Sequence, residues 1–430
     1  MIDSSLKTRN MFNRKTTLKP TQDRGPLRIL FVITSMPVGG AEMLLVNLIR
    51  RLDRGRFLPE VVCLKELGPL GEVLSQEIPV HHGLIRWKGD LRIFGCLTEL
   101  IGARRFDAVI TVGASDKMFW GRLAARWRQV PVIASALHST GWPDGVGWLN
   151  RRLTGWTDAL IGVAKAHGEH LIHGERFPAD KVWIIPNGVD TATFQPSDEP
   201  KTLLRHRLGL PDDGRLVGIV AALRPEKNHR LFLQVASRAV AAQPEVRFLV
   251  IGDGPERVRL EKYAEELAIG ERVHFLGNRS DIDQLLTALD LFVLTSDNEA
   301  NPVSILEAMA CGIPIVATRV GSVSEMVLHN ESGLLADARD ASELAAHVIR
   351  LLENEPLCRE MGQVGRQQVL ASASIDTMVH GYEHLVETIY NRKASPVAAR
   401  QSTGPPNPPA AILDRGDEVM EKPTFMEKPT

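Results

Sequence analysis

The chain has 430 residues, of which 44% are hydrophobic and 24% charged, enough for two ordinary soluble domains with a core each. A formal net charge of -1 gives no general attraction to nucleic acid. The four cysteines are far apart and form no CxxC pair, so we expect a reducing compartment and neither a disulfide framework nor a cysteine metal site.

Residues 1–26 are polar and basic, show no hydrophobic periodicity and contain no apolar segment of the kind found in secretory signals. We expect a flexible basic arm here. No apolar run in the chain approaches the roughly 18–20 residues of a membrane span. We therefore expect a cytoplasmic protein, and peripheral contact with the inner face of the cell membrane is compatible with this expectation.

The first predicted strand is the apolar run at 28–34, followed by a turn with Gly39 and Gly40 and a periodic helix at 43–52. A strand, a glycine-rich turn and a helix present backbone N–H groups to phosphate. The turn reads GGAE rather than GxGxxG, so a dinucleotide fingerprint is absent. A simple tight turn is the other interpretation of these two glycines.

Further apolar runs alternate with helical stretches and predict a doubly wound α/β domain over residues 27–195. The runs lie at 60–64, 107–111, 130–136, 158–163 and 182–186. Ligands of such sheets bind beyond the carboxyl ends of the strands. Gly39-Gly40, the segment 136–139 and the segment 187–190 fall there. His138 is either a hydrogen-bonded structural residue or a contact to a sugar hydroxyl.

A polar, proline-rich stretch at 195–200 predicts a linker, and a second doubly wound domain over 196–373 follows. Its strands are expected at 215–221, 246–251, 272–276, 291–294 and 313–317. Polar residues follow three of these strands, at 223–228, 252–255 and 296–299. Residues 374–391 predict a last helix that packs back on the first domain, and 392–430 predict a disordered tail.

The stretch at 297–312 carries two glutamates, Glu299 and Glu307, eight positions apart. They converge on one ligand if Glu299 lies in a loop and Glu307 in the first turns of the following helix. The start of that helix points N–H groups into the same space, which favours an anion. A ligand with hydroxyls and phosphates, such as a nucleotide sugar, fits this pattern.

Four short motifs in this order resemble the retaining GT-B glycosyltransferases of family 4, over roughly 27–390. They are GGAE at 39–42, RPEKNH at 224–229, GDGP at 252–255, and E-x7-E with AMACGIPIVAT at 299–318. The resemblance implies two Rossmann-like domains that face each other across a cleft, the first on the acceptor side and the second binding a nucleotide sugar.

The resemblance also implies a role for individual residues. Glu299 resembles the contact to the transferred sugar, and Glu307 the acceptor of ribose hydrogen bonds. Lys227 resembles the lysine that holds the donor diphosphate. Gly39-Gly40 resembles the loop that closes over that diphosphate, and His138 resembles a histidine that reaches the sugar.

The chain departs from the family pattern in two places. Many members carry an arginine five residues before the lysine, where this chain has Ala222, and Arg224 is the nearest basic residue. Arg224 either supplies the phosphate charge or faces solvent. Asn301-Pro302 stands where many members have Phe-Gly; Pro302 has no N–H, which leaves Asn301 and Val303 as backbone donors.

The implied reaction moves a hexosyl unit from a UDP- or GDP-linked donor to a hydroxyl of a glycan or lipid-linked acceptor, with retention, in polysaccharide or glycolipid synthesis. We expect no cofactor and no metal. The only Asp-x-Asp sequence, Asp281 to Asp283, opens an amphipathic helix, where acids suit the cap and first turn. Two alternatives remain: a nucleotide-sugar 2-epimerase of the same fold, and a noncatalytic nucleotide-sugar-binding protein.

The first half of the chain is rich in arginine and aromatic residues, for example over 120–128. Such a helix can lie on anionic lipid, or it can be an ordinary solvated face whose tryptophans pack inward. Trp142, Trp148 and Trp156 follow His138 and either stack on an acceptor sugar or belong to the core.

Overall fold

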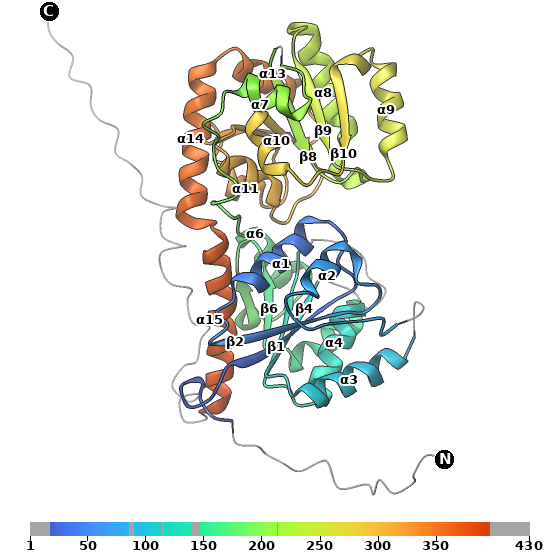
Figure 1. Ribbon diagram of the computed structural model, residues 1–430, viewed down its shortest axis with the longest axis vertical. Helices are drawn as coiled ribbons and strands as arrows, with labels where there is room; N and C mark the ends of the chain where they lie inside the picture. The colour runs from blue at the N-terminus through green and yellow to red at the C-terminus, as the bar shows by residue number, and fades with distance from the viewer. Residues whose placement is uncertain (1–17, 86–89, 114–115, 139–146, 213, 396–430) are drawn as a thin grey trace, which may run out of the picture.

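The computed structural model describes residues 18–85, 90–113, 116–138, 147–212 and 214–395. They form two α/β domains, one above the other in Figure 1, each built on a fully parallel sheet with helices on both faces. The doubly wound fold class predicted from the sequence is confirmed. Trp142, Ser139 and the tail beyond residue 395 lie outside the described residues.

The sheet of the N-terminal domain has the order β3-β2-β1-β4-β5-β6-β7. Its strands are β1 (Leu27–Ile33), β2 (Phe57–Cys63), β3 (Val80–His82), β4 (Ala108–Val112), β5 (Val132–Ala136), β6 (Ala159–Gly162) and β7 (Val182–Ile184). The strand order reverses between β1 and β4, and ligands of open sheets bind at such a reversal. Gly39-Gly40 follows β1 directly. The short, partly polar β3 was not expected from the sequence.

The helices of this domain connect consecutive strands. They are α1 (Gly40–Arg51), α2 (Gly68–Leu74), α3 (Arg92–Arg104), α4 (Asp116–Trp127), α5 (Gly147–Arg152) and α6 (Lys165–Glu169). Short turns are η1 (Thr21–Asp23), η2 (Leu153–Trp156), η4 (Ala179–Lys181), and the π-helical η3 (His170–Gly174). Helix α1 begins three residues earlier than expected, because Gly39 is its N-cap.

The sheet of the C-terminal domain has the order β10-β9-β8-β11-β12-β13. Its strands are β8 (Leu216–Val220), β9 (Arg247–Ile251), β10 (Val273–Gly277), β11 (Leu291–Leu294), β12 (Ile315–Thr318) and β13 (Gly333–Ala336). The helices are α7 (Lys201–Leu208), α8 (His229–Ala242), α9 (Arg257–Glu266), α10 (Ile282–Ala288), α11 (Val303–Ala310), α12 (Val323–Met326), α13 (Ala341–Leu352) and α14 (Glu355–Ser372), with turns η5 (Pro225–Lys227) and η6 (Gly270–Arg272). Strand β13 was not among the expected strands.

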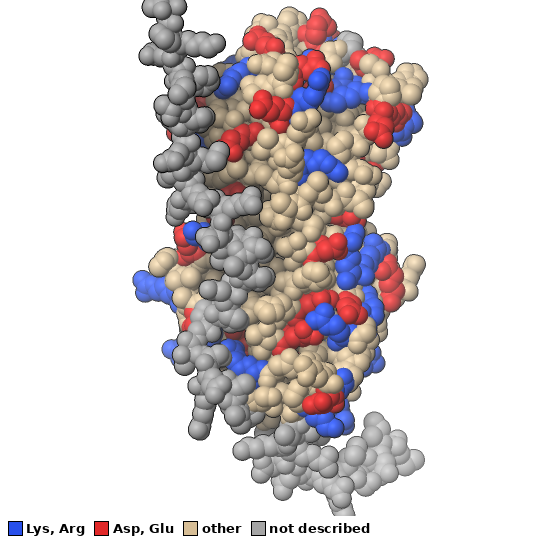
Figure 2. Space-filling view, turned by 90° about the vertical axis from the view of Figure 1, so that its left-hand side faces the viewer, with Lys and Arg blue, Asp and Glu red and all other residues tan. Residues whose placement is uncertain are grey.

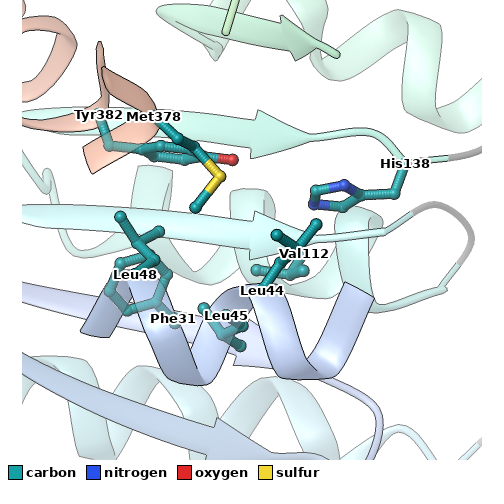
Figure 3. A pocket seen from close by; sticks show the side chains of 8 residues that line it. All are labelled: Phe31, Leu44, Leu45, Leu48, Val112, His138, Met378 and Tyr382. Carbon is teal, nitrogen blue, oxygen red and sulfur yellow. The ribbon is translucent and has the colours of Figure 1, made fainter. Parts of the chain in front are cut away.

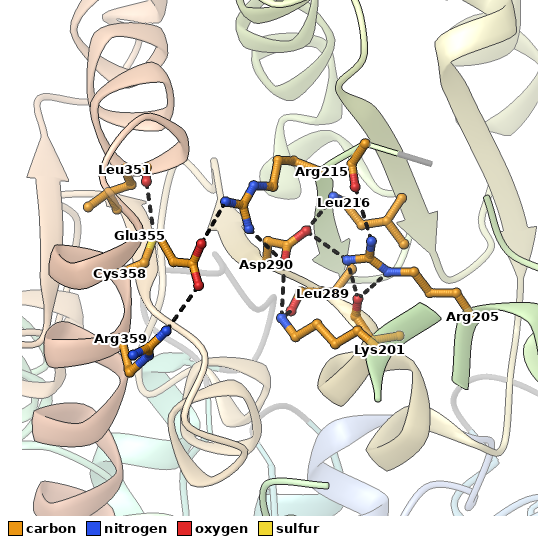
Figure 4. A network of polar contacts seen from close by, with 12 residues as sticks. Lys201, Arg205, Arg215, Leu216, Leu289, Asp290, Leu351, Glu355, Cys358 and Arg359 are labelled. Atoms are coloured by element: carbon orange, nitrogen blue, oxygen red, sulfur yellow. Dashed lines mark hydrogen bonds and ion pairs between the residues drawn. The ribbon is translucent and has the colours of Figure 1, made fainter. Parts of the chain in front are cut away.

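A network of charged side chains centres on Asp290, which directly precedes β11 at the end of the sheet opposite the cleft (Figure 4). The Asp290 carboxylate accepts hydrogen bonds from Arg205 at 2.7 Å and from the Leu216 amide at 2.8 Å, and pairs with Lys201 at 3.1 Å. Burial alone would raise the pKa of Asp290, but Lys201 and Arg205 hold it below its usual value. The network ties α7 to the start of β8.

Helix α15 (Ile375–Ala394) returns to the N-terminal domain, where Met378, Tyr382 and Leu385 join the core formed by α1 and the sheet (Figure 1). Charges of both signs are interspersed over the visible face that carries α14 and α15 (Figure 2). The described part of the N-terminal arm is held down: the Arg24 guanidinium pairs with Asp107 at 2.8 Å.

Candidate functional site

Two helix N-termini face each other between the domains. A Cβ built on Gly40, at the start of α1, would lie 3.9 Å from a methyl group of Val303, at the start of α11. Neither helix has a side-chain cap, since Gly39 and Pro302 occupy the cap positions. At α1 the amide of Glu42 already interacts with its own carboxylate. The other first-turn N–H groups of the two helices favour an anion beside them. The structure thus brings Gly39-Gly40 and Val303 together across the cleft.

Lys227 and Glu299 form an ion pair in the C-terminal domain at this cleft. The Lys227 ammonium lies 2.6 Å from Oε1 of Glu299, and the Ser296 hydroxyl donates to the same oxygen at 2.6 Å. Glu299 is only 7% exposed. Gly321 fixes its backbone: φ is +51°, and a Cβ there would lie 1.8 Å from the Glu299 carbonyl oxygen. The lysine predicted to hold the diphosphate and the carboxylate predicted to contact the sugar are thus in direct contact.

The loops that carry these two residues are joined to each other. The Asp297 amide donates to the Glu226 carbonyl at 2.9 Å, and the Asn228 side chain donates to Asp297 at 3.0 Å. The GDGP turn joins them, because the Leu223 amide donates to the Asp253 carbonyl at 3.0 Å. The polar groups expected beyond three strand ends therefore form one wall.

Glu307 lies on α11, four residues after its first residue, and Glu299 lies in the preceding loop, as the sequence predicted. The Glu307 residue is partly buried, and its carboxyl has no hydrogen-bond or ion-pair partner within the described ranges. Burial raises the pKa of Glu307 from 4.5 to about 8. An unpartnered carboxyl of this kind can accept hydroxyl hydrogen bonds from a ligand.

The sequence analysis assigned no role to Glu42 and Lys117 on the opposite wall of the cleft. Burial raises the pKa of Glu42, in the first turn of α1, while its own amide and the positive charges of Lys117 and Arg224 oppose the shift. Arg224 belongs to the C-terminal domain and is exposed, and its charge acts on Glu42 across the cleft. Arg224 is therefore placed at the cleft. Arg224 and the GGAE motif that contains Glu42 were both found in the sequence, but only the approach of the domains reveals that their charges act on each other.

His138 lies beyond β5 and lines a small, mainly apolar cavity of the N-terminal domain (Figure 3). Phe31, Leu44, Leu45, Leu48, Val112, Met378 and Tyr382 form the rest of its wall. Burial, with smaller effects of His167 and Lys117, lowers the pKa of His138 to about 4. Its buried Nδ1 has no partner among the described residues. The imidazole is neutral and adjoins the core as well as the strand end.

Two hydrogen-bonded contacts join the domains next to this site. The Asn187 side chain donates to the Asn301 carbonyl at 2.9 Å. The Glu325 carboxylate accepts from the amides of Lys165 and Ala166 at 2.9 and 2.6 Å. Asn187 belongs to a segment that the sequence placed beyond a strand end, but its partner could not be inferred from sequence.

Asp281 occupies the N-cap position of α10 and Asp283 its first turn, as expected. The Asp281 carboxylate pairs with Arg279 at 2.6 Å instead of capping an amide, which corrects the expected capping bond. In the part of the chain that the structure describes, no group of three metal-ligating side chains is found. Among the same residues no helix is both long and apolar enough to cross a membrane.

Trp156 is 48% exposed, with the Arg126 guanidinium 5.8 Å from its ring centre. The side chain of Trp148 lies outside the described residues.

Two Rossmann-like domains with phosphate-compatible helix ends facing each other define the GT-B class of glycosyltransferases. Residues 38–193 match glycosyltransferase family 4 and residues 200–368 match glycosyl transferases group 1. Together these matches cover most of the chain, which belongs to the family 4, group 1 glycosyltransferases. The resemblance carried by the four motifs is confirmed.

Relatives and solved structures agree with this assignment. An N-acetyl-alpha-D-glucosaminyl L-malate synthase of Bacillus anthracis is 30% identical over 50% of this chain, and the match spans 54% of that protein. A UDP-Gal:alpha-D-GlcNAc-diphosphoundecaprenol alpha-1,3-galactosyltransferase of Escherichia coli is 27% identical over 71% of this chain and 83% of its own length. The crystal structure of Anabaena HepE with UDP has a TM-score of 0.74 and 24% identity, and covers 84% of this chain and all of that one.

Proposed function

We propose that the protein transfers a hexosyl unit from a UDP- or GDP-linked sugar to a hydroxyl of a glycan or lipid-linked acceptor. The observation that carries this proposal is the Lys227–Glu299 pair of 2.6 Å on the cleft wall that also carries the uncapped start of α11. The Lys227 cation and the start of α11 suit the diphosphate of such a donor, and the Glu299 carboxylate beside them suits its sugar.

The chemistry requires stabilisation of the departing diphosphate, on which negative charge grows as the glycosidic bond breaks. A positioned cation and helix N–H groups stabilise that charge more in the transition state than in the ground state. Lys227 and the starts of α1 and α11 are the groups for this role, with Arg224 as the second cation in place of the arginine absent at Ala222. Glu299 then takes a sugar hydroxyl, and Glu307 the ribose.

We further propose that transfer retains the anomeric configuration and needs no metal or other cofactor. A protein clamp of Lys227, Arg224 and helix N–H groups can neutralise a diphosphate by itself. In a retaining reaction without a protein nucleophile, the acceptor hydroxyl attacks on the face that the diphosphate leaves, and the leaving phosphate oxygen takes its proton. Neutral His138 supplies a polar contact to the sugar in this scheme.

The acceptor side is proposed to meet a membrane surface. Leu91, Trp127 and Trp156 are 72%, 61% and 48% exposed on the N-terminal domain. Phe94 packs on Trp127 at 5.7 Å, and Arg126 lies over Trp156. Exposed aromatic rings beside arginines suit the headgroup region of an anionic bilayer. The name of the Escherichia coli relative contains a diphosphoundecaprenol-linked sugar, which supports a lipid-linked acceptor, while the name of the Bacillus anthracis relative contains L-malate.

A thermal-shift and calorimetric screen tests this function. UDP-glucose, UDP-galactose, UDP-N-acetylglucosamine and GDP-mannose are the probes, followed by acceptor mixtures and detection of the released nucleoside diphosphate. Binding of one probe with acceptor-dependent diphosphate release supports the proposal. Conversion of the sugar without an acceptor would identify an epimerase, binding without turnover a noncatalytic protein, and no binding at all would refute nucleotide-sugar recognition.

A further inference from the structure

The polypeptide passes between the two domains twice, and the two crossings lie side by side. The Val189 amide donates to the Ala373 carbonyl, and the Ile375 amide donates to the Val189 carbonyl, both at 2.9 Å. Gly188 packs so closely on the second crossing that a Cβ would lie 2.5 Å from the Ser374 carbonyl oxygen. The backbone around residue 188 is therefore fixed to the hinge between the domains.

Asn187 extends from this hinge into the donor wall of the cleft. Its side chain is 5% exposed, and its Nδ2 donates to the Asn301 carbonyl at 2.9 Å. Asn301 lies between Glu299 and Val303 in the chain. The preceding carbonyls of Glu299 and Ala300 accept hydrogen bonds from Ser322 of the same domain. The hydrogen bond from Asn187 instead reaches this loop from the N-terminal domain.

The side chain of Asn301 is incompletely used in the structure. Its Oδ1 atom is buried and accepts no hydrogen bond from any described residue. A buried acceptor without a donor costs free energy until a donor arrives. The hydroxyls of a sugar held by Glu299 are donors of the required kind.

We propose that Asn187 is a positioning residue for donor recognition. Its hydrogen bond sets the Asn301 loop when the two domains are in the arrangement seen here, and so directs the Asn301 amide oxygen to a hydroxyl of the transferred sugar. This inference rests on the proposed function and adds the link between domain arrangement and sugar recognition. It requires that Asn187 affects the binding free energy of the sugar part of the donor and not that of its nucleotide part.

Calorimetry with two probes tests this requirement: the nucleotide sugar that gives the largest thermal shift in the screen, and its matching nucleoside diphosphate. Asn187→Asp keeps the side-chain size but removes the NH₂ donor and sets a carboxylate oxygen against the Asn301 carbonyl. We expect the affinity for the nucleotide sugar to fall about tenfold, and that for the diphosphate to stay within about twofold. Equal losses for both probes, or no loss for either, would overturn the inference.

Asn391→Asp is the matched control, because Asn391 also donates through Nδ2, to Thr21 at 3.0 Å, but on α15. We expect it to leave both affinities unchanged. Asn301→Ala removes the unpaired oxygen and keeps the carbonyl, so it provides a second route if Asn187→Asp folds poorly. The double variant should lose no more nucleotide-sugar affinity than the larger single loss. Losses that multiply would show independent residues and refute the coupling. A wild-type protein that binds no nucleotide sugar would instead refute the proposed function, and this inference with it.

Discussion

Glu307 should release a proton when the donor binds. In the free protein burial raises its pKa to about 8, so at pH 7 most molecules carry the protonated carboxyl. Hydroxyls of a ribose donate to the ionised carboxylate and stabilise it, which returns the pKa toward its ordinary value. Binding at pH 7 should therefore release up to about one proton per site.

The sign of the pH dependence follows from the same shift. The affinity should rise by up to about tenfold per pH unit between about pH 4.5 and pH 8, and level off above pH 8. In the free protein the raised pKa has the opposite effect on folding. The stability contribution of the neutral carboxyl is fully present below pH 4.5 and is lost as the pH rises through about 8. His138 and His229, whose pKa values burial lowers to about 4, stay neutral over this window.

Calorimetry in buffers of low and high ionisation enthalpy measures the released proton. A nucleotide sugar is the right probe, because its diphosphate has no group that titrates near neutral pH, unlike a free nucleoside diphosphate. Glu307→Gln should abolish both the proton release and the rise of affinity with pH. A binding enthalpy that is the same in both buffers for the wild-type protein would refute the ribose role derived from this carboxyl.

Three further predictions concern the clamp, the metal and the membrane. Lys227→Ala should lower turnover at least tenfold and up to about a thousandfold, because a charge-stabilising donor is lost. The control variant Lys262→Ala, in an exposed ion pair on α9, should not lower turnover. Near-wild-type turnover of Lys227→Ala would remove the lysine from the mechanism. Activity should persist in EDTA, and a complete loss restored by Mg²⁺ would contradict the metal-free clamp. Sedimentation with phosphatidylglycerol-containing vesicles should be weakened by Trp127→Ser but not by Leu203→Ser, a 57% exposed residue of the other domain; equal binding of both variants would exclude the Trp127 surface.

The strands that could be placed from the sequence were the buried ones. Runs such as Leu291–Leu294 are fully buried in the sheet and read as continuous apolar stretches. Strand β3 was not predicted, because it has only three residues and two of them are histidines. The helix carrying Glu307 was also placed well, because a proline and an apolar run mark its start.

Groups defined by the approach of two distant segments could not be placed in the same way. Asn187 and Asn301 are 114 positions apart, and although the sequence analysis placed each near a ligand site, nothing in the sequence indicated that they form a pair. The charge of Arg224 acts on Glu42 only because the loop after β8 and the start of α1 border the same cleft. Local patterns report which face of a strand or helix is buried, but they do not report how two domains are set against each other.

The return of α15 to the first domain affects how the protein is made. The N-terminal domain emerges first from the ribosome, yet Met378, Tyr382 and Leu385 of its core are translated only after the whole C-terminal domain. The apolar faces of Leu44 and Leu48 therefore stay uncovered during most of synthesis. The two crossings that flank the C-terminal domain pair at Val189 and Ser374, and this domain can complete its own sheet before α15 is made. The domain that is translated first is thus the one completed last, and its open core is the part of the nascent chain that a chaperone would have to protect.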